Sequence, residues 1–453
     1  MLNYIQQDEK IGGNNMKFVI IGGDAAGMSA AMEIVRNVES PNITTLEQTA
    51  IYSYGQCGLP YVVDGRIPST DDLIARSVDA FRDKYAIDAR IHHQVTNIDT
   101  KKRIVYGDDF EVPYDKLLIA TGASPLIPNW KNRQLKGIHT IKTIPQMHAL
   151  LKDNAQAQHV TVIGGGYIGL EMAEVLTAAG KQVTLVQRGA QLANMLDTDM
   201  VDIVHKEAER QNVIVRLNTE VTGFKGDDVV EYVVTSQGDI ATDLVIAAIG
   251  VAPSTGFVDQ HIARAKNGAI IVDAHMQTSV ENVYAAGDCA THYNRIKAQN
   301  DYIPLGTTAN KQGRIAGLNM AGKFARFKGV VGTSILKFFD YTIGVTGLNE
   351  KAAKALHIPY VVYQYEGNHI ASYYPNVKPL QIKMLVHQHT ERILGVQIIG
   401  EAGVDKRIDV VATALSNQMT LSDLLDLDLA YAPPFNGVWD ALQHVAKRNS
   451  KID

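Results

Sequence analysis

Residues 159–180 read HVTVIGGGYIGLEMAEVLTAAG, and this segment indicates the architecture of the chain most clearly. An apolar, β-branched run leads into glycines and then into helix-forming residues, which predicts a buried strand, a tight turn and a helix. Gly164, Gly166 and Gly169 form a complete G-x-G-x-x-G pattern. Glycines at these places let the backbone turn closely, so that a pyrophosphate can lie on the N–H groups at the helix start. The stretch therefore predicts a dinucleotide site.

The same plan occurs near the start of the chain, in KFVIIGGDAAGMSAAMEIVR, residues 17–36. Asp24 stands where the second glycine of the pattern is expected, so this copy is weaker on its own. Glu47 supports it, because it ends the next predicted strand, NITTLE, where an acidic residue accepts hydrogen bonds from a ribose. A glycine-rich turn without a ligand is the alternative for either copy. The first copy comprises Gly22, Gly23, Ala26 and Gly27.

Two more predicted strands end in residues that suit a ligand. KLLIATGASP ends at Thr121 and Gly122, and TSVENVYAAGDCA ends at Gly287 and Asp288. An aspartate at the carboxyl end of a parallel strand is well placed to contact a ligand in the crevice of the sheet, although it serves equally well as a helix cap. Two fingerprints and two such strands suggest a relay between two dinucleotide cofactors.

The order of the motifs predicts that one nucleotide-binding domain is inserted in another. DLVIAAIGVAP, residues 243–253, is the expected return crossing. Strands that alternate with helical stretches predict an α/β fold with a doubly wound, Rossmann-like parallel sheet in both domains. A C-terminal α+β part follows, and we hypothesise that the native chain starts at Met16. The expected boundaries are a polar extension (1–15), a first nucleotide domain (16–123 and 250–325), a second (124–249) and an interface domain (326–453).

The composition narrows the classes of function. The 453 residues are 46% hydrophobic and 20% charged, with a net charge of −5, so no chain-wide basic field favours nucleic acid. No apolar run reaches the roughly 18 residues that cross a membrane. Two cysteines cannot build a disulfide framework, which favours a reducing cytoplasm. The histidines are not spaced with carboxylates as in a metal site, so no metal is expected.

The motifs together resemble the flavin-dependent pyridine nucleotide–disulfide oxidoreductases over residues 16–453. Besides the two fingerprints, the chain carries the A-T-G motif at residues 120–122 and the T-x6-A-x-G-D flavin motif. The resemblance implies FAD in the first domain and a nicotinamide cofactor in the second. Within the family, YSYGQCGLPYV, SYYPN, GVDKRIDV and AYAPPFNGVWD resemble the single-cysteine coenzyme A-disulfide reductases. The flavin motif consists of Thr278, Ala285, Gly287 and Asp288.

Cys57 is the candidate reactive thiol. Dithiol members of the family use C-x4-C, but Val62 stands where the second cysteine would be. Cys289 reads as a small core residue, because free cysteine is usually buried. A plausible helix start at Leu59–Pro60 follows Cys57, so we expect a lowered thiol pKa and a reactive thiolate.

The resemblance supplies the missing partner thiol, which belongs to the substrate. It implies that CoA disulfide, or a CoA persulfide or CoA mixed disulfide, is reduced through a Cys57–CoA mixed disulfide beside FAD. It also implies a homodimer in which Tyr373 and Tyr431 of the partner subunit donate protons to the leaving thiolate. Tyr374 adjoins Tyr373 and is an alternative donor, and structural interface tyrosines are the other interpretation. The positions that match CoA contacts are Ser29, Arg36, Ser53, Gln56 and Asn310.

Two rival functions stay open. Related NADH oxidases and peroxidases cycle one cysteine through sulfenic acid, but their fingerprint carries a histidine where this chain has Ala25. A non-catalytic flavin-bound redox sensor would leave Cys57 and both tyrosines without a role.

The second fingerprint also predicts the nicotinamide cofactor. Gln187 stands where an acidic residue would bind the ribose hydroxyls of NADH, and Arg188 can pair with a 2′-phosphate. Lys181 could add positive charge, and Gly250 follows the strand of the return crossing. We therefore expect NADPH to be preferred and NADH to be tolerated. An arginine that points to solvent, with both cofactors accepted, is the alternative.

Overall fold

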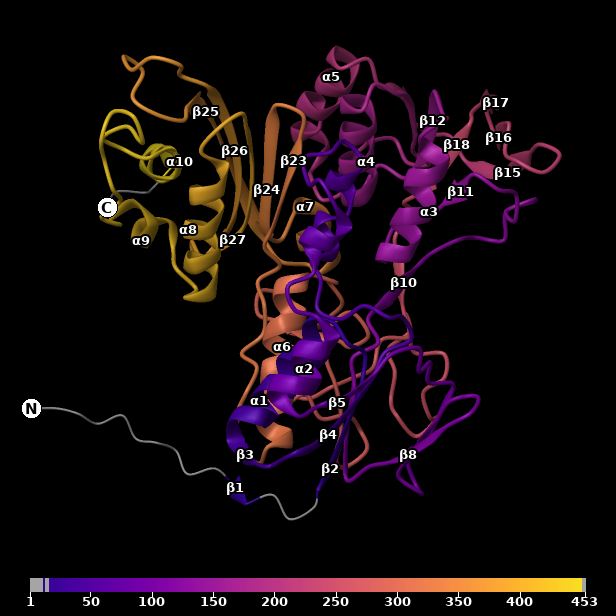
Figure 1. The fold of residues 1–453 in the computed structure, drawn as a ribbon. Coiled ribbons are helices and arrows are strands. Elements are labelled where there is room, and N and C mark those ends of the chain that lie inside the picture. The colour runs from indigo at the N-terminus through magenta and orange to yellow at the C-terminus, as the bar shows by residue number, and fades with distance from the viewer. Residues whose placement is uncertain (1–10, 13–15, 450–453) are drawn as a thin grey trace, which may run out of the picture.

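The computed structural model describes residues 11–12 and 16–449 (Figure 1). The predicted extension 1–15 and the hypothesis of a start at Met16 therefore concern residues that lie almost wholly outside this description. The described chain forms three parts, each built on a five-stranded sheet. Figure 1 shows the first part below, the second at upper right and the third at upper left.

The first sheet is entirely parallel, in the order β20-β9-β2-β4-β5. The chain turns from β2 into helix α1 at the place where the strand order reverses, between β2 and β9. That switch point is where open α/β sheets bind ligands. The bounds are β2 (Lys17–Ile21), β4 (Asn42–Leu46), β5 (Asp88–Arg90), β9 (Lys116–Ile119), β20 (Val283–Ala285), α1 (Ala25–Asn37), α2 (Val78–Tyr85) and α6 (Gly306–Met320).

Helices α1 and α6 cross closely on one face of this sheet (Figure 1). A methyl group at Gly313 would lie 2.2 Å from the carbonyl oxygen of Ala26, and one at Gly317 would lie 2.5 Å from that of Ala30. Only small residues allow such an approach, because the two helix backbones touch. The contact joins residues almost 300 positions apart around one core.

The second sheet repeats the design, with parallel order β11-β18-β12-β13-β14. Its fingerprint turn again leaves the central strand, β12, at the point where the strand order reverses. A small antiparallel sheet, β15-β16-β17, flanks it. The bounds are β11 (Ile138–His139), β12 (His159–Ile163), β13 (Gln182–Val186), β14 (Ile214–Arg216), β18 (Leu244–Ala247), α3 (Ile144–Asn154), α4 (Tyr167–Ala178), α5 (Asp202–Arg210), β15 (Val221–Lys225), β16 (Tyr232–Thr235) and β17 (Gly238–Ala241).

Two short strands carry the chain between these parts. β10 (Ala123–Pro125) leaves the first part, β19 (Val251–Pro253) returns to it, and the two pair antiparallel. The predicted insertion of one Rossmann-like unit in another is therefore confirmed, while the exact domain boundaries remain predictions. A second three-stranded sheet of the first part comprises β6 (Asn97–Asp99), β7 (Ile104–Tyr106) and β8 (Glu111–Pro113).

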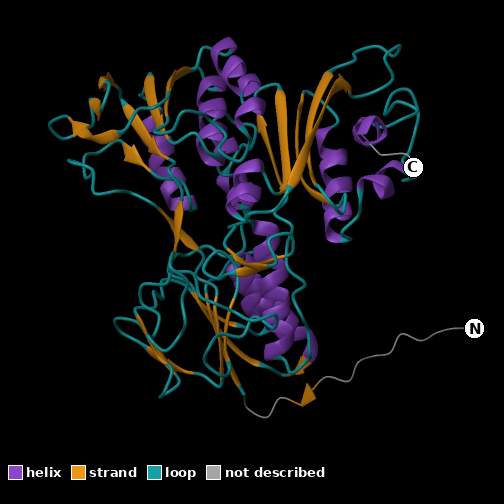
Figure 2. Cartoon of the chain, turned by 180° about the vertical axis from the view of Figure 1, so that it is seen from behind, coloured by secondary structure: helices purple, strands orange, loops and turns teal. Residues whose placement is uncertain are grey.

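The third part has an antiparallel sheet in the order β23-β24-β27-β26-β25, with its three C-terminal helices on one face (Figure 2). This is the α+β arrangement expected for the C-terminal residues. No helix in the described part of the chain is both long and apolar enough to cross a bilayer. The bounds are β23 (Ser334–Phe338), β24 (Tyr341–Gly347), β25 (Tyr360–Asn368), β26 (Pro379–His387), β27 (Ile393–Gly400), α7 (Glu350–Ala355), α8 (Val404–Ser416), α9 (Leu421–Leu425) and α10 (Ala441–Asn449).

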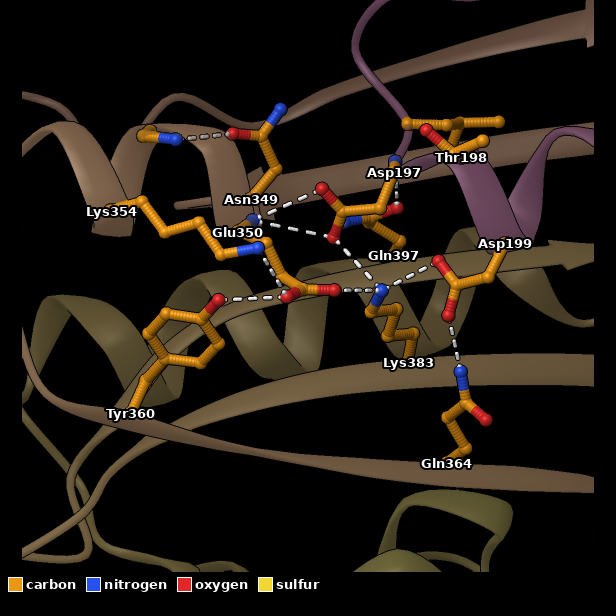
Figure 3. Close-up of polar contacts among 12 residues, drawn as sticks. Asp197, Thr198, Asp199, Asn349, Glu350, Lys354, Tyr360, Gln364, Lys383 and Gln397 are labelled. Carbon is orange, nitrogen blue, oxygen red and sulfur yellow. Dashed lines mark hydrogen bonds and ion pairs between the residues drawn. The ribbon is translucent and has the colours of Figure 1, made fainter.

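A buried lysine fastens the second part to the third (Figure 3). The ammonium of Lys383, on β26, is 1% exposed and lies 2.6 Å from Asp199, 2.6 Å from Glu350 and 3.2 Å from Asp197. Gln397 donates a further hydrogen bond to Asp197 at 2.7 Å. The three carboxylates are close enough together to suit a metal ion, but the ammonium of Lys383 already supplies the positive charge among them.

Candidate active site

The two fingerprint turns have matching geometry. Gly22 and Gly164 both have positive φ angles, of 112° and 109°. A methyl group at either would lie within 2.5 Å of a carbonyl oxygen on the neighbouring strand end, at Ala120 and Ala248 respectively. Gly27 and Gly169 each face the carbonyl oxygen of the first glycine in the same close way. The predicted glycines are therefore required by the backbone in both copies.

Both turns leave the start of a helix open. Neither the first residue before α1, Asp24, nor the one before α4, Gly166, caps its helix with a side chain. A methyl group at Gly166 would meet nothing within 4 Å. Free N–H groups beside open space fit a phosphate. The two sites thus fit the dinucleotides that the sequence predicts.

The strand-end residues Glu47 and Gln187 also occupy equivalent places. Glu47 accepts a hydrogen bond from the N–H of Gly23 at 3.0 Å, and Gln187 accepts one from the N–H of Gly165 at 3.1 Å. The other carboxylate oxygen of Glu47 accepts hydrogen bonds from the N–H and the hydroxyl of Thr49, at 2.8 and 2.9 Å. This correspondence supports the prediction that both residues contact a nucleotide.

The other predicted flavin residues line the same end of the first sheet. Gly122 has a φ of 65° and open space where a side chain would be, and Thr121 donates a hydrogen bond to the carbonyl of Ser254 at 2.8 Å. Asp288 follows β20, and its carboxylate forms an ion pair with the ammonium group of Lys142 at 3.1 Å. No helix starts at Asp288, so the helix-cap alternative is wrong. A recess lined by Gly287, Asp288 and the start of α6 lies beside it.

Cys57 lies in a loop that is bound to the first fingerprint turn through contacts with Gly23. The ring of Tyr52 packs on Gly23, and the N–H of Ser53 donates to the carbonyl of Gly23 at 2.9 Å. Ser53 itself has a φ of 48°. The loop ends in a 3₁₀ turn, Gln56–Gly58, in which Cys57 is the central and exposed residue. Cys289 is wholly buried, and burial raises its pKa to about 11, which confirms that it is a core residue.

The expected lowering of the Cys57 pKa is wrong. The segment after it forms only another 3₁₀ turn, Pro60–Val62, rather than an α-helix with a useful dipole. Burial raises the pKa of the Cys57 thiol, and the nearby carboxylate of Glu171 raises it further. Lys142 acts in the opposite direction. The thiol is therefore held protonated more strongly than an ordinary cysteine.

Two glutamates of α4 were missed by the sequence reasoning. Glu174 is buried, and its carboxylate forms ion pairs with Arg66 at 2.7 Å and with Lys337 at 2.9 Å. Arg66 belongs to the first part and Lys337 to the third, so Glu174 links all three parts of the fold. Glu171, one turn earlier, has Tyr61 at 3.5 Å instead of a cation. Burial raises the pKa of Glu171 to about 7. The helix spacing of the pair is visible in the sequence, but their partners come from distant segments.

The predicted CoA-contact residues lie along the α1–α6 pair and the cysteine loop. The hydroxyl of Ser29 donates to the carbonyl of Asn310 at 3.1 Å, which brings these two positions together. Arg36 is largely exposed and pairs with Glu33 at 2.8 Å. Arg314, an exposed cation one turn after Asn310, lies 3.8 Å from the same carboxylate and was missed. The side-chain nitrogen of Gln56 donates to Asp24 at 2.6 Å.

Tyr373 and Tyr431 meet in the third part of the fold. Their hydroxyl oxygens are 3.0 Å apart, and both side chains are exposed. Phe435, Val438 and Trp439 are exposed in the same C-terminal segment as Tyr431. Such a gathering of exposed aromatic and apolar side chains is typical of a protein interface.

The predicted nicotinamide-site residues differ in exposure. Arg188 is exposed, whereas Lys181 donates to the carbonyl of Ala157 at 2.7 Å and is thus engaged elsewhere. Gly250 has a φ of 118°, which favours glycine. Arg216, at the end of the adjacent strand β14, is a further exposed cation that the sequence reasoning missed.

Comparison with known proteins agrees with this architecture. Residues 16–313 match the pyridine nucleotide-disulphide oxidoreductase family, and residues 333–442 match its dimerisation domain. The chain is 40% identical to NAD(P)H sulfur oxidoreductase (CoA-dependent) of Pyrococcus abyssi, over 95% of this chain and 97% of that protein. It is 33% identical to an NADH oxidase of Methanocaldococcus jannaschii (95% and 98%) and 30% identical to coenzyme A disulfide reductase of Staphylococcus haemolyticus (93% and 96%).

A solved structure shares the whole arrangement. Reduced CoADR-RHD of Bacillus anthracis superposes with a TM-score of 0.93 at 33% identity, covering 97% of this chain and 80% of that one. The matches span both nucleotide-binding units and the C-terminal part. The chain therefore belongs to the pyridine nucleotide-disulphide oxidoreductase family and is an FAD-dependent oxidoreductase that uses NAD(P)H.

Proposed function

We propose that this protein reduces CoA disulfide to CoA thiol with NAD(P)H, through a Cys57–CoA mixed disulfide. The observation that carries the proposal is Cys57 itself. It is an exposed thiol on a loop attached to the flavin fingerprint, and no second thiol is at hand, because Cys289 is wholly buried. A lone reactive thiol needs a substrate that brings the other sulfur. Relatives named for CoA-dependent sulfur or disulfide reduction support this choice.

The chain's own residues account for the sulfur chemistry. The Cys57 thiolate, which forms when the preceding mixed disulfide is reduced, attacks one sulfur of CoA disulfide, a Cys57–S–S–CoA bond forms, and one CoA thiolate leaves. Tyr431 of the partner subunit, assisted by Tyr373 of the partner subunit, gives that thiolate a proton. FAD held at the turn of Gly22 and Gly27 would supply the electron pair, drawn from NAD(P)H, with which the Cys57–S–S–CoA bond is reduced and the second CoA is released. Cys57 is then a thiolate again and the cycle is closed.

Charged side chains suit the phosphates of CoA. Arg36 and Arg314 are exposed on α1 and α6, beside the contact between Ser29 and Asn310. Arginine pairs strongly with phosphate, and Glu33 between them keeps both guanidinium groups oriented until a substrate competes. CoA persulfide and CoA mixed disulfides carry the same CoA phosphates and a similar S–S bond, so they belong to the expected substrate range. A reducing cytoplasm, where CoA thiols are kept reduced, is the expected compartment.

The rival is an NADH oxidase or peroxidase that uses Cys57 as sulfenic acid. Ala25 in the fingerprint argues against it, because no histidine stands beside the thiol to assist that chemistry. The test is NADPH and NADH oxidation by the purified holoenzyme with CoA disulfide, CoA persulfide, hydrogen peroxide or oxygen alone. We expect rapid oxidation that requires a CoA substrate. Equal rates with oxygen or peroxide alone would favour the rival, and no turnover with any acceptor would favour a redox sensor.

A further inference from the structure

Asp24 is the one residue of the first fingerprint that departs from the glycine pattern, and its side chain explains why. Its φ of −114° and ψ of −154° are extended, so any residue can adopt this backbone. The carboxylate does not cap α1. It turns instead toward the cysteine loop, where it accepts the N–H of Tyr54 at 3.2 Å and the side-chain N–H of Gln56 at 2.6 Å.

These two hydrogen bonds reach the loop close to the reactive thiol. The backbone of Ser53 is held by Gly23 on one side and by Ala75 on the other, and Gly55 is held by Leu73. Within the described residues, the Asp24–Gln56 bond is the long-range hydrogen bond that comes nearest to Cys57 along the preceding chain. Burial raises the pKa of the Asp24 carboxyl, and the bonds from Gln56 and Tyr54 act in the opposite direction, because they favour the ionised form.

We propose that Asp24 is a positioning residue, which fixes the Cys57 loop on the flavin fingerprint through Tyr54 and Gln56. The inference rests on the proposed role of Cys57 in disulfide reduction. A carboxylate in a phosphate-binding turn is electrostatically unfavourable, so a glycine there would suit the cofactor better. The bonds of Asp24 are instead made to the loop. Tight placement matters, since a displacement of about 1 Å can cost about 10²-fold in rate.

Several charged side chains besides Asp24 influence the pKa of the Cys57 thiol. Glu171 and Asp288 raise the pKa of Cys57 and Lys142 lowers it, whereas Asp24 has the smallest influence of the four. Removing the Asp24 charge should therefore change the thiol pKa little. Loss of the Asp24 side chain should act mainly by displacing the Cys57 sulfur. A slower reaction without a change in the thiol pKa therefore distinguishes a positioning role from an electrostatic one.

The test compares Asp24→Gly with Asp24→Asn in the holoenzyme. Glycine restores the complete fingerprint and removes both bonds to the loop, whereas asparagine keeps an acceptor for Tyr54, and a flipped Gln56 amide restores the second bond. We expect Asp24→Gly to retain FAD and its reduction by NAD(P)H, while kcat for CoA disulfide falls about tenfold or more with KM little changed. Asp24→Asn should stay within about threefold of the unaltered protein, as should the exposed carboxylate control Asp228→Asn.

A second measurement does not need disulfide turnover. Cys289 is wholly buried, so iodoacetamide alkylation at neutral pH reports Cys57. Asp24→Gly should speed alkylation several-fold and Gln56→Ala should speed it less, and the double variant should not exceed Asp24→Gly, because Gln56→Ala removes only one of the two bonds that Asp24→Gly removes. If the unaltered protein does not reduce CoA disulfide, the proposed function fails, yet this alkylation pattern still supports Asp24. Unchanged alkylation in Asp24→Gly, equal effects of glycine and asparagine, or loss of FAD in Asp24→Gly would overturn the inference.

Discussion

The hydroxyl oxygens of Tyr373 and Tyr431 lie 3.0 Å apart, although the residues come from separate loops of the C-terminal part. Tyr373 lies between β25 and β26, and Tyr431 lies between α9 and α10. The hydrogen bond between the two hydroxyls raises the pKa of Tyr373, so this phenol stays protonated at neutral pH. In the proposed mechanism, these two exposed phenols protonate the CoA thiolate that leaves in the partner subunit.

Replacement by phenylalanine tests these donors, because it keeps each ring and removes the proton. General acid catalysis contributes about 10²–10⁴-fold, so Tyr373→Phe/Tyr431→Phe together should lower CoA disulfide turnover by that order. Either single variant should be milder, since the remaining hydroxyl can take over. Steady-state kcat at constant dimer concentration measures the effect.

Tyr374→Phe is the matched control. Tyr374 adjoins Tyr373 and is exposed, but among the described residues no hydrogen bond to its hydroxyl is present. It should leave turnover within about twofold. A loss in Tyr374→Phe as large as that in the double variant would transfer the donor role to Tyr374.

Cys57→Ser should abolish CoA disulfide reduction while FAD binding and flavin reduction by NAD(P)H persist. Serine replaces the nucleophile with a hydroxyl that forms no disulfide, and the two nucleotide sites do not include residue 57. Absorbance of the bound flavin and stopped-flow reduction check the retained steps. Cys289→Ala is the control and should stay active, because Cys289 only packs and donates weakly to two backbone carbonyls. Normal turnover by Cys57→Ser would refute the mechanism.

Glu171 should control how the thiol of Cys57 responds to pH. Its carboxylate raises the pKa of Cys57, and its own pKa lies at about 7. Glu171→Gln should therefore lower the Cys57 pKa and speed iodoacetamide alkylation above pH 7, where the natural side chain is ionised. Well below pH 7 the natural Glu171 is already neutral, so both proteins should react alike, which serves as the internal control. Equal alkylation rates across the whole pH range would contradict the assignment.

Lys383→Met should destabilise the protein strongly. Methionine keeps the apolar stem but leaves Asp197, Asp199 and Glu350 without the buried cation, and removing one partner of a buried ion pair costs about 3–5 kcal/mol. Lys354→Met is the control, because Lys354 pairs with the same Glu350 from an exposed position, 67% accessible. An exposed pair contributes much less than a buried one, because solvent screens the charges. Denaturant unfolding of the holoenzyme compares the two, and similar losses would show that burial is unimportant here.

The same network fixes the direction of the pH dependence. Burial lowers the pKa of Lys383, but bonds to Asp199 and Glu350 outweigh it and raise the pKa to about 12. Its stabilisation is complete below the ordinary lysine pKa and is lost as the pH rises through about 12. The bond from Lys383 lowers the pKa of Glu350 to about 2. That contribution is complete above the ordinary glutamate pKa and is lost as the pH falls towards about 2.

Local patterns predicted the two strand–turn–helix units, because each fingerprint places its glycines and helix start within six residues. The inserted topology followed from the order of two such patterns. The environment of Cys57 could not be predicted in this way. Its pKa depends on burial and on Glu171, which lies more than 100 residues away, and the helix expected after Leu59 is only a 3₁₀ turn. From the sequence, Asp24 is only a departure from the glycine pattern, because its contact with Gln56, 32 residues away, depends on the folded loop.

The last prediction concerns the choice between NADPH and NADH. The side-chain oxygen of Gln187 accepts the N–H of Gly165, which leaves its NH₂ group free to donate toward the ribose. A carboxylate at this place would repel a 2′-phosphate, whereas an amide does not, and the exposed Arg188 can pair with the phosphate. We therefore expect the unaltered protein to have the higher kcat/KM with NADPH and to accept NADH.

Gln187→Glu should reverse that preference. Like charges in contact cost several kcal/mol, which corresponds to at least about a tenfold shift of the kcat/KM ratio towards NADH. Arg188→Ala should lower kcat/KM with NADPH and leave NADH unaffected, because NADH lacks the phosphate that the guanidinium would bind. Lys136→Ala is the control for a general loss of positive charge. Lys136 is an exposed cation that pairs with Asp228 in the same part of the fold. A preference of the unaltered protein for NADH, or equal losses with both cofactors in Arg188→Ala, would show that the strand end does not recognise the phosphate.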